Sequence, residues 1–234
     1  MRYWLVMPAA GAGRRFDPGV PKQYAPLAGR TVIEWALAPF LADARCTHAV
    51  VVAAPGDLHW VRIAARLDAA RVSSADGGGE RSQSVRRGLA ALEARAQADE
   101  WVLVHDAARP CLPPADLERL LGRLEGHAVG GLLAIPAADT LKRAGSAPGG
   151  AAVAETLDRS DLWRAQTPQM FRFGRLCEAL DRAHAGGRFA TDEAQALEWQ
   201  GEHPLLVEGS GTNLKITTPD DLPLAAAVLR SRAP

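Results

Sequence analysis

The sequence has 234 residues, of which 47% are hydrophobic and 23% are charged, a composition typical of a globular chain with a substantial core. Basic and acidic residues number 27 each, so the formal net charge is zero and a nucleic-acid-binding surface is not indicated. Apolar stretches are too short for a membrane span or a signal peptide, and the three cysteines are far apart, so we expect a cytoplasmic protein with reduced thiols and no membrane partner.

Short apolar runs alternate along the chain with longer segments of helical spacing. Strands are predicted at residues 3–7, 49–53, 101–104, 131–135 and 204–207. Helices are predicted at residues 32–41, 58–67, 82–94, 116–124, 174–185 and 192–199, and from about residue 219 onward. Thr31 and Glu34 have the spacing of a capping box at the start of the first helix. This alternation predicts an α/β fold, with a mostly parallel sheet and helices on both faces.

The alternation is interrupted between residues 137 and 164. A loop rich in glycine, alanine, serine and proline at residues 144–151 separates two short segments, 140–143 and 153–157, that could pair as a hairpin. We therefore expect a sheet domain made of residues 1–136 and 165–234, and a protruding β-arm made of residues 137–164.

A glycine-rich run, PAAGAGRRF, follows the first predicted strand. Ligands of open α/β sheets bind beyond the carboxyl ends of the strands, and glycines allow backbone N–H groups to approach phosphate oxygens. Phe16 stands where a dinucleotide-binding fingerprint has its third glycine, and no Gly-Lys-Ser/Thr of a P-loop follows. The run alone could be a structural turn, but with Arg15 and Lys22 it predicts a triphosphate site.

Three further motifs carry polar residues near predicted strand ends. In VHDAARP, Asp106 could hold Mg²⁺ or a polar substrate and Arg109 could bind a phosphate, whereas His105 has the pattern of a buried histidine. The loop DGGGERSQS could read a base or bind an anion through its N–H groups and hydroxyls, or could be a flexible loop with Ser82 as helix cap. Lys215, in NLKIT, could reach the same phosphates.

Taken in order, these motifs resemble those of the methylerythritol phosphate cytidylyltransferases. The matching runs are PAAGAGRRF, PKQY, GGGERSQSV, VHDAARP, DTLKR, LDRSDLW, QTPQMF, TDE and NLKIT. The resemblance extends from Val6 to about Leu222. It implies a Rossmann-like sheet domain, a protruding β-arm, a homodimer with interlocked arms, a requirement for Mg²⁺ and a role in non-mevalonate isoprenoid precursor synthesis.

The resemblance also implies roles for individual residues. CTP would be bound by Ala9, Ala10, Gly11, Ala12, Gly13 and Gly78, with Ser84 near the cytosine. The catalytic residues would be Arg15, Lys22 and Lys215. The acceptor would be bound by Asp106, Arg109 and Thr167, together with Thr140 and Arg159 of the partner's arm, and Asp106 would also be a metal ligand. Gly79 stands where the family often has a charged residue, so the reading of cytosine would depend on backbone groups and Ser84.

The implied reaction moves CMP from CTP to 2-C-methyl-D-erythritol 4-phosphate and releases pyrophosphate. Another polyol phosphate, such as ribitol 5-phosphate, stays open as the acceptor. A non-catalytic nucleotide-binding regulator on the same scaffold is a second alternative, because a fold does not determine a function. The missing third glycine argues against a nicotinamide dehydrogenase.

Overall fold

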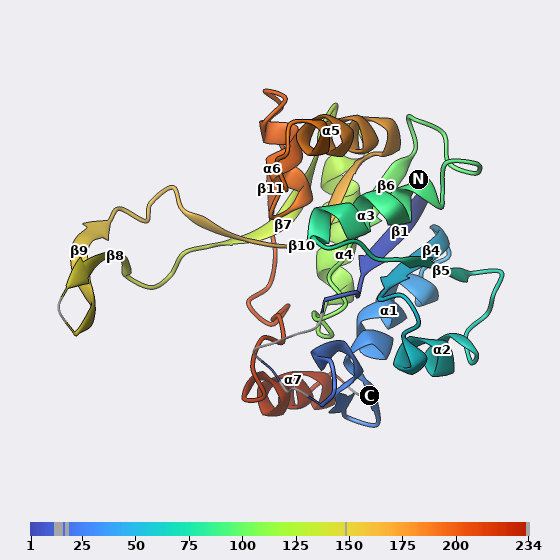
Figure 1. Ribbon diagram of the computed structural model, residues 1–234, viewed down its shortest axis with the longest axis horizontal. Coiled ribbons are helices and arrows are strands. Elements are labelled where there is room, and N and C mark those ends of the chain that lie inside the picture. The colour runs from blue at the N-terminus through green and yellow to red at the C-terminus, as the bar shows by residue number, and fades with distance from the viewer. Residues whose placement is uncertain (12–15, 17–18, 148, 233–234) are drawn as a thin grey trace.

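The computed structural model describes residues 1–11, 16, 19–147 and 149–232. A seven-stranded sheet with the order β11-β7-β10-β6-β1-β4-β5 forms its centre (Figure 1). Its strands are β1 (Tyr3–Pro8), β4 (Cys46–Ala53), β5 (Val72–Asp76), β6 (Trp101–Val104), β7 (Gly130–Pro136), β10 (Trp163–Arg172) and β11 (Leu205–Glu208). β10 pairs antiparallel with both β6 and β7, whereas the other neighbouring strands are parallel. The predicted α/β class, a mostly parallel sheet, is confirmed.

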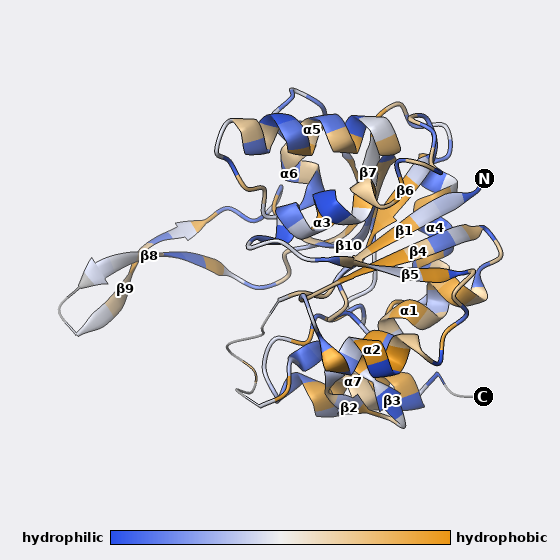
Figure 2. Ribbon diagram, turned by 45° about the vertical axis from the view of Figure 1, so that its right-hand side comes forward, coloured by the Kyte–Doolittle hydropathy of each residue, from blue (hydrophilic) through white to orange (hydrophobic). Residues whose placement is uncertain are grey.

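Helices cover both faces of this sheet. They are α1 (Val32–Ala42), α2 (Leu58–Ala64), α3 (Arg81–Ala90), α4 (Pro114–Leu124), α5 (Phe173–Ala185) and α6 (Glu193–Glu198), whereas α7 (Asp221–Arg230) lies apart from the sheet (Figure 1). Side chains of β1 alternate between the two faces: Leu5 and Met7 pack with α1, α2 and α4, whereas Trp4 and Val6 pack with α3, α5 and α6. Figure 2 shows the resulting concentration of hydrophobic residues in the central strands.

Residues 22–31, which precede α1, form short elements near α7. These are the 3₁₀ turn η1 (Lys22–Tyr24) and the paired strands β2 (Pro26–Leu27) and β3 (Arg30–Thr31). The predicted capping box of Thr31 and Glu34 is present at the start of α1. Ile216 and Ala225, from the C-terminal part of the chain, pack with Leu27 and Val32 in a separate apolar cluster. This packing holds Lys22 and Lys215 on the same side of the molecule.

The sequence patterns did not predict β5 or β10. β5 has the sequence VSSAD, and it lies at the edge of the sheet. β10 carries polar residues, and its pairing with β7 is irregular between Ala165 and Gln169. A bulge of this kind redirects side chains, and here it places Gln166 and Thr167 beside the carboxyl end of β6.

The predicted β-arm is present as a hairpin of β8 (Leu141–Ala147) and β9 (Gly150–Leu157) that extends away from the sheet (Figure 1). Its strands are longer than the segments predicted from sequence. Val153 of the arm is 65% exposed, and Trp163 at the base of the arm is 37% exposed. The exact domain boundaries, and the part played by the arm in dimerisation, stay predictions. Among the described helices, none is long and apolar enough to cross a membrane.

Candidate active site

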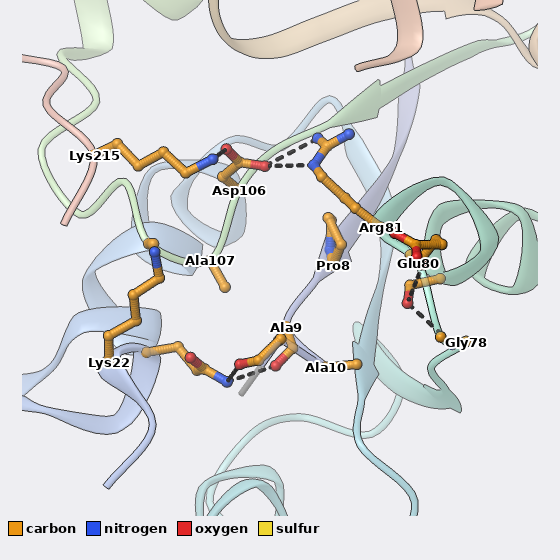
Figure 3. Close-up of a pocket in the computed structure, with 15 residues that line it drawn as sticks. Pro8, Ala9, Ala10, Lys22, Gly78, Glu80, Arg81, Asp106, Ala107 and Lys215 are labelled. Atoms are coloured by element: carbon orange, nitrogen blue, oxygen red, sulfur yellow. Dashed lines mark hydrogen bonds and ion pairs between the residues drawn. The ribbon is translucent and has the colours of Figure 1, made fainter. Parts of the chain in front are cut away.

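A cavity of about 470 Å³ lies beyond the carboxyl ends of β1 and β6 (Figure 3). Segments that are far apart in sequence line it: residues 8–11 at the end of β1, residues 22–23 of η1, the glycine loop before α3 with the start of that helix, the residues after β6, and Lys215. The cavity brings together the predicted site residues Ala9, Ala10, Gly11, Lys22, Gly78, Ser84, Asp106 and Lys215. Ala12, Gly13 and Arg15, which were predicted to belong to the same site, lie outside the described residues.

A second cavity of about 180 Å³ adjoins the first. The two cavities share Arg81, Asp106 and Lys215 in their linings. The predicted acceptor residues Arg109 and Thr167 line only the second cavity. Arg109 and Thr167, which are expected to bind the acceptor, are therefore separated from the residues that are expected to bind only the nucleotide. The charged cluster of Arg81, Asp106 and Lys215 lies between the two cavities.

Two of the chain's three lysines line the larger cavity. The sequence has 27 basic residues, and the lysines among them are Lys22, Lys142 and Lys215. A lysine ammonium is a compact point charge, unlike the planar arginine fork. A chain that uses arginine for most of its cations thus places two compact cations in the cavity for which the sequence predicts a triphosphate.

Gln23 fixes the backbone of the run after β1. Its Nε2 donates to the carbonyl oxygens of Ala9 at 2.6 Å and Gly11 at 3.1 Å, and its side chain is 4% exposed. The carbonyl groups of Ala9 and Gly11 are thereby held toward Gln23. We did not predict this role from the sequence, although Gln23 belongs to the PKQY motif.

Ser84 organises the glycine loop before α3. Its Oγ accepts a hydrogen bond from the Gly78 N–H at 3.0 Å and donates to the Glu80 carbonyl at 3.2 Å. Glu80 is the N-cap of α3 and shares a capping box with Gln83, so the alternative in which Ser82 caps this helix is wrong. The hydroxyl predicted to lie near a base therefore also holds the loop in place.

The glycine loop passes so close to the residues after β1 that one of its positions has no room for a side chain. A β-carbon built at Gly77 would lie 2.2 Å from the Ala10 Cβ, which is far inside van der Waals contact. A β-carbon at Gly79 would meet only the Gln83 Oε1, at 3.5 Å. Gly77 is thus required for the two loops to meet, whereas the position of Gly79 has room for a side chain.

Asp106 is the centre of the charged cluster between the cavities. Its Oδ1 accepts from Arg81 Nε and Nη2 at 3.0 and 2.9 Å, and its Oδ2 lies 2.7 Å from the Lys215 Nζ. Arg109 Nε lies 3.9 Å from the same Oδ2. Burial opposes ionisation of Asp106, but Arg81, Lys215 and Arg109 lower the pKa of its carboxyl well below the ordinary value. Asp106 is therefore ionised at neutral pH.

The donor atoms near Asp106 bear on how a magnesium ion would be held. Among the described residues, no group of three or more His, Cys, Asp or Glu side chains could hold a metal ion. Both carboxylate oxygens of Asp106 are already paired with cations. Mg²⁺ is commonly bound by substrate phosphates with one or two carboxylates. The site fits an ion held mainly by phosphate oxygens, and direct ligation by Asp106 stays a prediction.

His105 and Thr167 hold the backbone around Asp106. The Asp106 N–H donates to the Thr167 Oγ1 at 3.0 Å, and this hydroxyl lies 3.1 Å from the His105 Nδ1. His105 Nε2 lies 3.1 Å from the Arg109 carbonyl oxygen. Burial lowers the pKa of His105 to about 4, so the ring is neutral and carries its proton on Nε2, facing the carbonyl. The buried interpretation of His105 agrees with this geometry.

Thr140 and Arg159 line neither cavity of their own chain. Both residues are exposed. Thr140 directly precedes β8, and Arg159 follows β9, so both belong to the segment that extends away from the sheet (Figure 1). In a single copy of the chain, these two predicted acceptor residues are not part of the site.

Two residues of the charged cluster were not predicted as site residues. Arg81 lies in the GGGERSQSV run and Glu193 in the TDE run, so both motifs were noticed, but neither side chain was given a role. Arg81 Nη1 donates to Glu193 Oε1 at 2.7 Å across 112 positions of sequence. No local signal indicates such a contact.

Comparison with known proteins identifies the family of this chain. The family model described as 2-C-methyl-D-erythritol 4-phosphate cytidylyltransferase matches residues 3–231. A protein of that name from Pseudomonas aeruginosa (strain UCBPP-PA14) is 54% identical over 224 residues, which cover 94% of this chain and 93% of the relative. One from Ectopseudomonas mendocina is 52% identical over 222 residues, with coverage of 94% and 93%.

Solved structures give the same result. A crystal structure of 4-diphosphocytidyl-2C-methyl-D-erythritol synthase has a TM-score of 0.84 and 38% identity, covering 97% of this chain and 98% of the other. The Francisella tularensis 2-C-methyl-D-erythritol 4-phosphate cytidylyltransferase has a TM-score of 0.82 and 33% identity, covering 97% and 100%. The family model, the relatives and the solved structures show that this chain belongs to the 2-C-methyl-D-erythritol 4-phosphate cytidylyltransferase family.

Proposed function

We propose that this protein transfers CMP from CTP to 2-C-methyl-D-erythritol 4-phosphate and releases pyrophosphate, a step of non-mevalonate isoprenoid precursor synthesis. The observation that carries the proposal is the pair of adjoining cavities that meet at Asp106 and Lys215. The larger cavity has the lysines and backbone groups that suit a triphosphate, and the smaller one has the polar groups that suit a phosphorylated polyol. Family membership supports the same assignment.

The proposed chemistry is an in-line displacement at the α-phosphorus of CTP. A phosphate oxygen of the acceptor forms the new P–O bond, and the bond to the β-phosphate breaks, so pyrophosphate leaves with the electron pair. The attacking oxygen is already anionic, so no general base is required. Among the described residues, the buried His105 is not placed for that role, because both ring nitrogens already have partners.

Catalysis then consists of positioning and charge neutralisation. Lys22 and Lys215 line the nucleotide cavity and would stabilise negative charge on the triphosphate as the bond breaks. Arg15 is proposed to join them. A bound Mg²⁺ would screen the phosphate oxygens so that an anionic nucleophile could approach. The Asp106 carboxylate would orient the acceptor by accepting hydrogen bonds from the acceptor's hydroxyl groups. Arg109 would provide positive charge on the acceptor side.

We also propose that the protein is a homodimer whose arms complete the acceptor sites. The support is the exposure of β8 and β9 and of the apolar side chain of Val153. A lone two-stranded hairpin is at best marginally stable in water, and packing against a second copy under two-fold symmetry would bury it. Thr140 and Arg159 would then lie near the partner's Asp106 neighbourhood.

A test of the proposed function measures pyrophosphate release in parallel reactions. We expect release with CTP, magnesium and 2-C-methyl-D-erythritol 4-phosphate, and much slower release when UTP replaces CTP or when a chelator is in excess. Ribitol 5-phosphate in place of the methylerythritol phosphate serves as the matched acceptor control. Faster release with ribitol 5-phosphate would reassign the acceptor. Nucleotide binding without any release, for every acceptor, would indicate a regulator and would contradict an enzymatic function.

A further inference from the structure

Arg81 connects the nucleotide loop to the acceptor side of the site. It is the first residue of α3, directly after the glycine loop, and its side chain lines both cavities. Its Nε and Nη2 donate to Asp106 Oδ1, and its Nη1 and Nη2 donate to Glu193 Oε1 and Oε2 at 2.7 and 3.1 Å. All three guanidinium nitrogens are thus engaged, and the planar group is held between two carboxylates.

Glu193 is buried, and the start of its helix is hydrogen-bonded to the sheet. It is 1% exposed and is the first residue of α6. The start of α6 is bound to β10, because Gln169 Nε2 donates to Asp192 Oδ2 at 2.9 Å and the Ala194 N–H donates to Gln169 Oε1 at 2.8 Å. Burial raises the pKa of Glu193, and the ion pair with Arg81 opposes that shift. Glu193 lines neither cavity, and its side-chain hydrogen bonds are those that it accepts from Arg81.

The positive charge of Arg81 could be neutralised either by carboxylates or by a bound triphosphate. Arg81 faces the cavity where a triphosphate would lie, and an arginine fork is well matched to phosphate oxygens. Two carboxylates instead hold it on the acceptor side. Without Glu193, Arg81 would keep a single carboxylate partner and could turn toward the triphosphate. Asp106 would then lose the two hydrogen bonds that fix its Oδ1.

We propose that Glu193 and Arg81 are positioning residues that fix the Asp106 carboxylate for acceptor binding and keep the Arg81 guanidinium away from the triphosphate. This inference rests on the proposed function, because it assigns the acceptor to the Asp106 side. It predicts an effect on the acceptor and not on the nucleotide. A purely structural pair would, if lost, weaken both substrates together and lower the thermal stability.

The test compares Glu193→Gln with wild type in steady-state kinetics and in calorimetric titration of CTP. Displacement of a group by about 1 Å can lower a reaction rate by on the order of a hundredfold. By the same reasoning, we expect displacement of the Asp106 carboxylate to raise the acceptor KM by roughly ten- to a hundredfold. The Kd of CTP should stay within about twofold of wild type or become tighter, since the released Arg81 could add a phosphate contact.

Asp181→Asn is the matched control. Asp181 accepts hydrogen bonds from Arg86 Nε and Nη2, at 2.7 and 3.0 Å, and Arg86 lies on the same helix, α3, as Arg81. Asp181 and Arg86 line neither cavity. This variant also removes a carboxylate from an arginine of α3, and its KM values for both substrates should equal those of wild type.

Arg81→Lys provides the second variant, which keeps the charge but loses the fork. If Glu193 acts through Arg81, then adding Glu193→Gln to Arg81→Lys should raise the acceptor KM by much less than it does in wild type. The inference would be overturned if the effects of the two substitutions on the acceptor KM were fully additive, or if Glu193→Gln left the acceptor KM unchanged. In either case, normal turnover by the wild-type enzyme would leave the proposed function intact. An inactive wild-type enzyme would overturn the proposed function itself.

Discussion

Lys22→Ala is expected to lower kcat by on the order of a hundredfold or more, while the acceptor KM changes little. Lys22 from η1 and Lys215 from the C-terminal region both line the larger cavity (Figure 3), where we propose that the triphosphate binds. Removing one preorganised donor from developing negative charge costs about 3 kcal/mol of barrier in comparable cases, which corresponds to that loss of rate. Steady-state kinetics with both substrates varied would measure it.

Two control variants sharpen this prediction. Lys142→Ala removes the remaining lysine, whose Nζ donates to the Thr156 Oγ1 on the arm at 2.7 Å, and it should leave kcat near that of wild type. Lys22→Arg keeps the charge but replaces a compact ammonium with a planar fork, so it should restore only part of the rate. Asp106→Asn should instead raise the acceptor KM. Near-normal kcat in Lys22→Ala would show that this lysine is a surface charge without a catalytic role.

Mixing two inactive variants is expected to restore activity if the arms serve neighbouring sites. Lys22→Ala disables the site of its own chain, and Arg159→Ala disables the site to which the arm contributes. When both variants are unfolded together and refolded, random pairing makes about half of the dimers mixed. A mixed dimer would contain one site with both defects and one with none, so roughly a quarter of wild-type activity should return.

The controls for this experiment are refolded samples of each variant alone and of wild type, which set the background and the full activity. Subunit exchange is confirmed separately, by mass spectrometry of differently tagged chains. If Arg159 serves the site of its own chain, every site in the mixture keeps one defect and activity stays at background. That outcome, in a sample that contains mixed dimers, would refute the shared site.

Most of the sheet domain could be predicted from sequence because its central strands and helices have strong local patterns. β1 and β6 are buried apolar runs, and α1 has its capping box in the sequence. β10 was missed because its polar residues, including Gln166 and Thr167, interrupt the apolar pattern. These residues are buried because tertiary partners satisfy them, such as the Asp106 N–H for Thr167. Local propensity does not report such partners.

The residues of the candidate site likewise fall into some that could be predicted from the sequence and some that could not. Glycine-rich runs and charged residues after strands were visible in sequence, because loops at the carboxyl ends of parallel strands gather at one edge of a sheet. The roles of Arg81 and Glu193 were not visible, because they depend on contact between distant segments. The sequence pattern did not indicate that Arg81 and Lys215 form ion pairs with Asp106. Only the folded chain reveals how these charges are paired.

The proposed transfer is tested most directly by following the phosphorus NMR spectrum of the enzyme with CTP, magnesium and 2-C-methyl-D-erythritol 4-phosphate carrying ¹⁸O on its phosphate. We predict that the acceptor monoester signal is replaced by two coupled signals of a diphosphate diester, with one pyrophosphate formed for each. The label should remain entirely in the diester, because the acceptor oxygen attacks the α-phosphorus. An unchanged acceptor signal while CTP is hydrolysed, or label found in pyrophosphate, would contradict the proposed reaction.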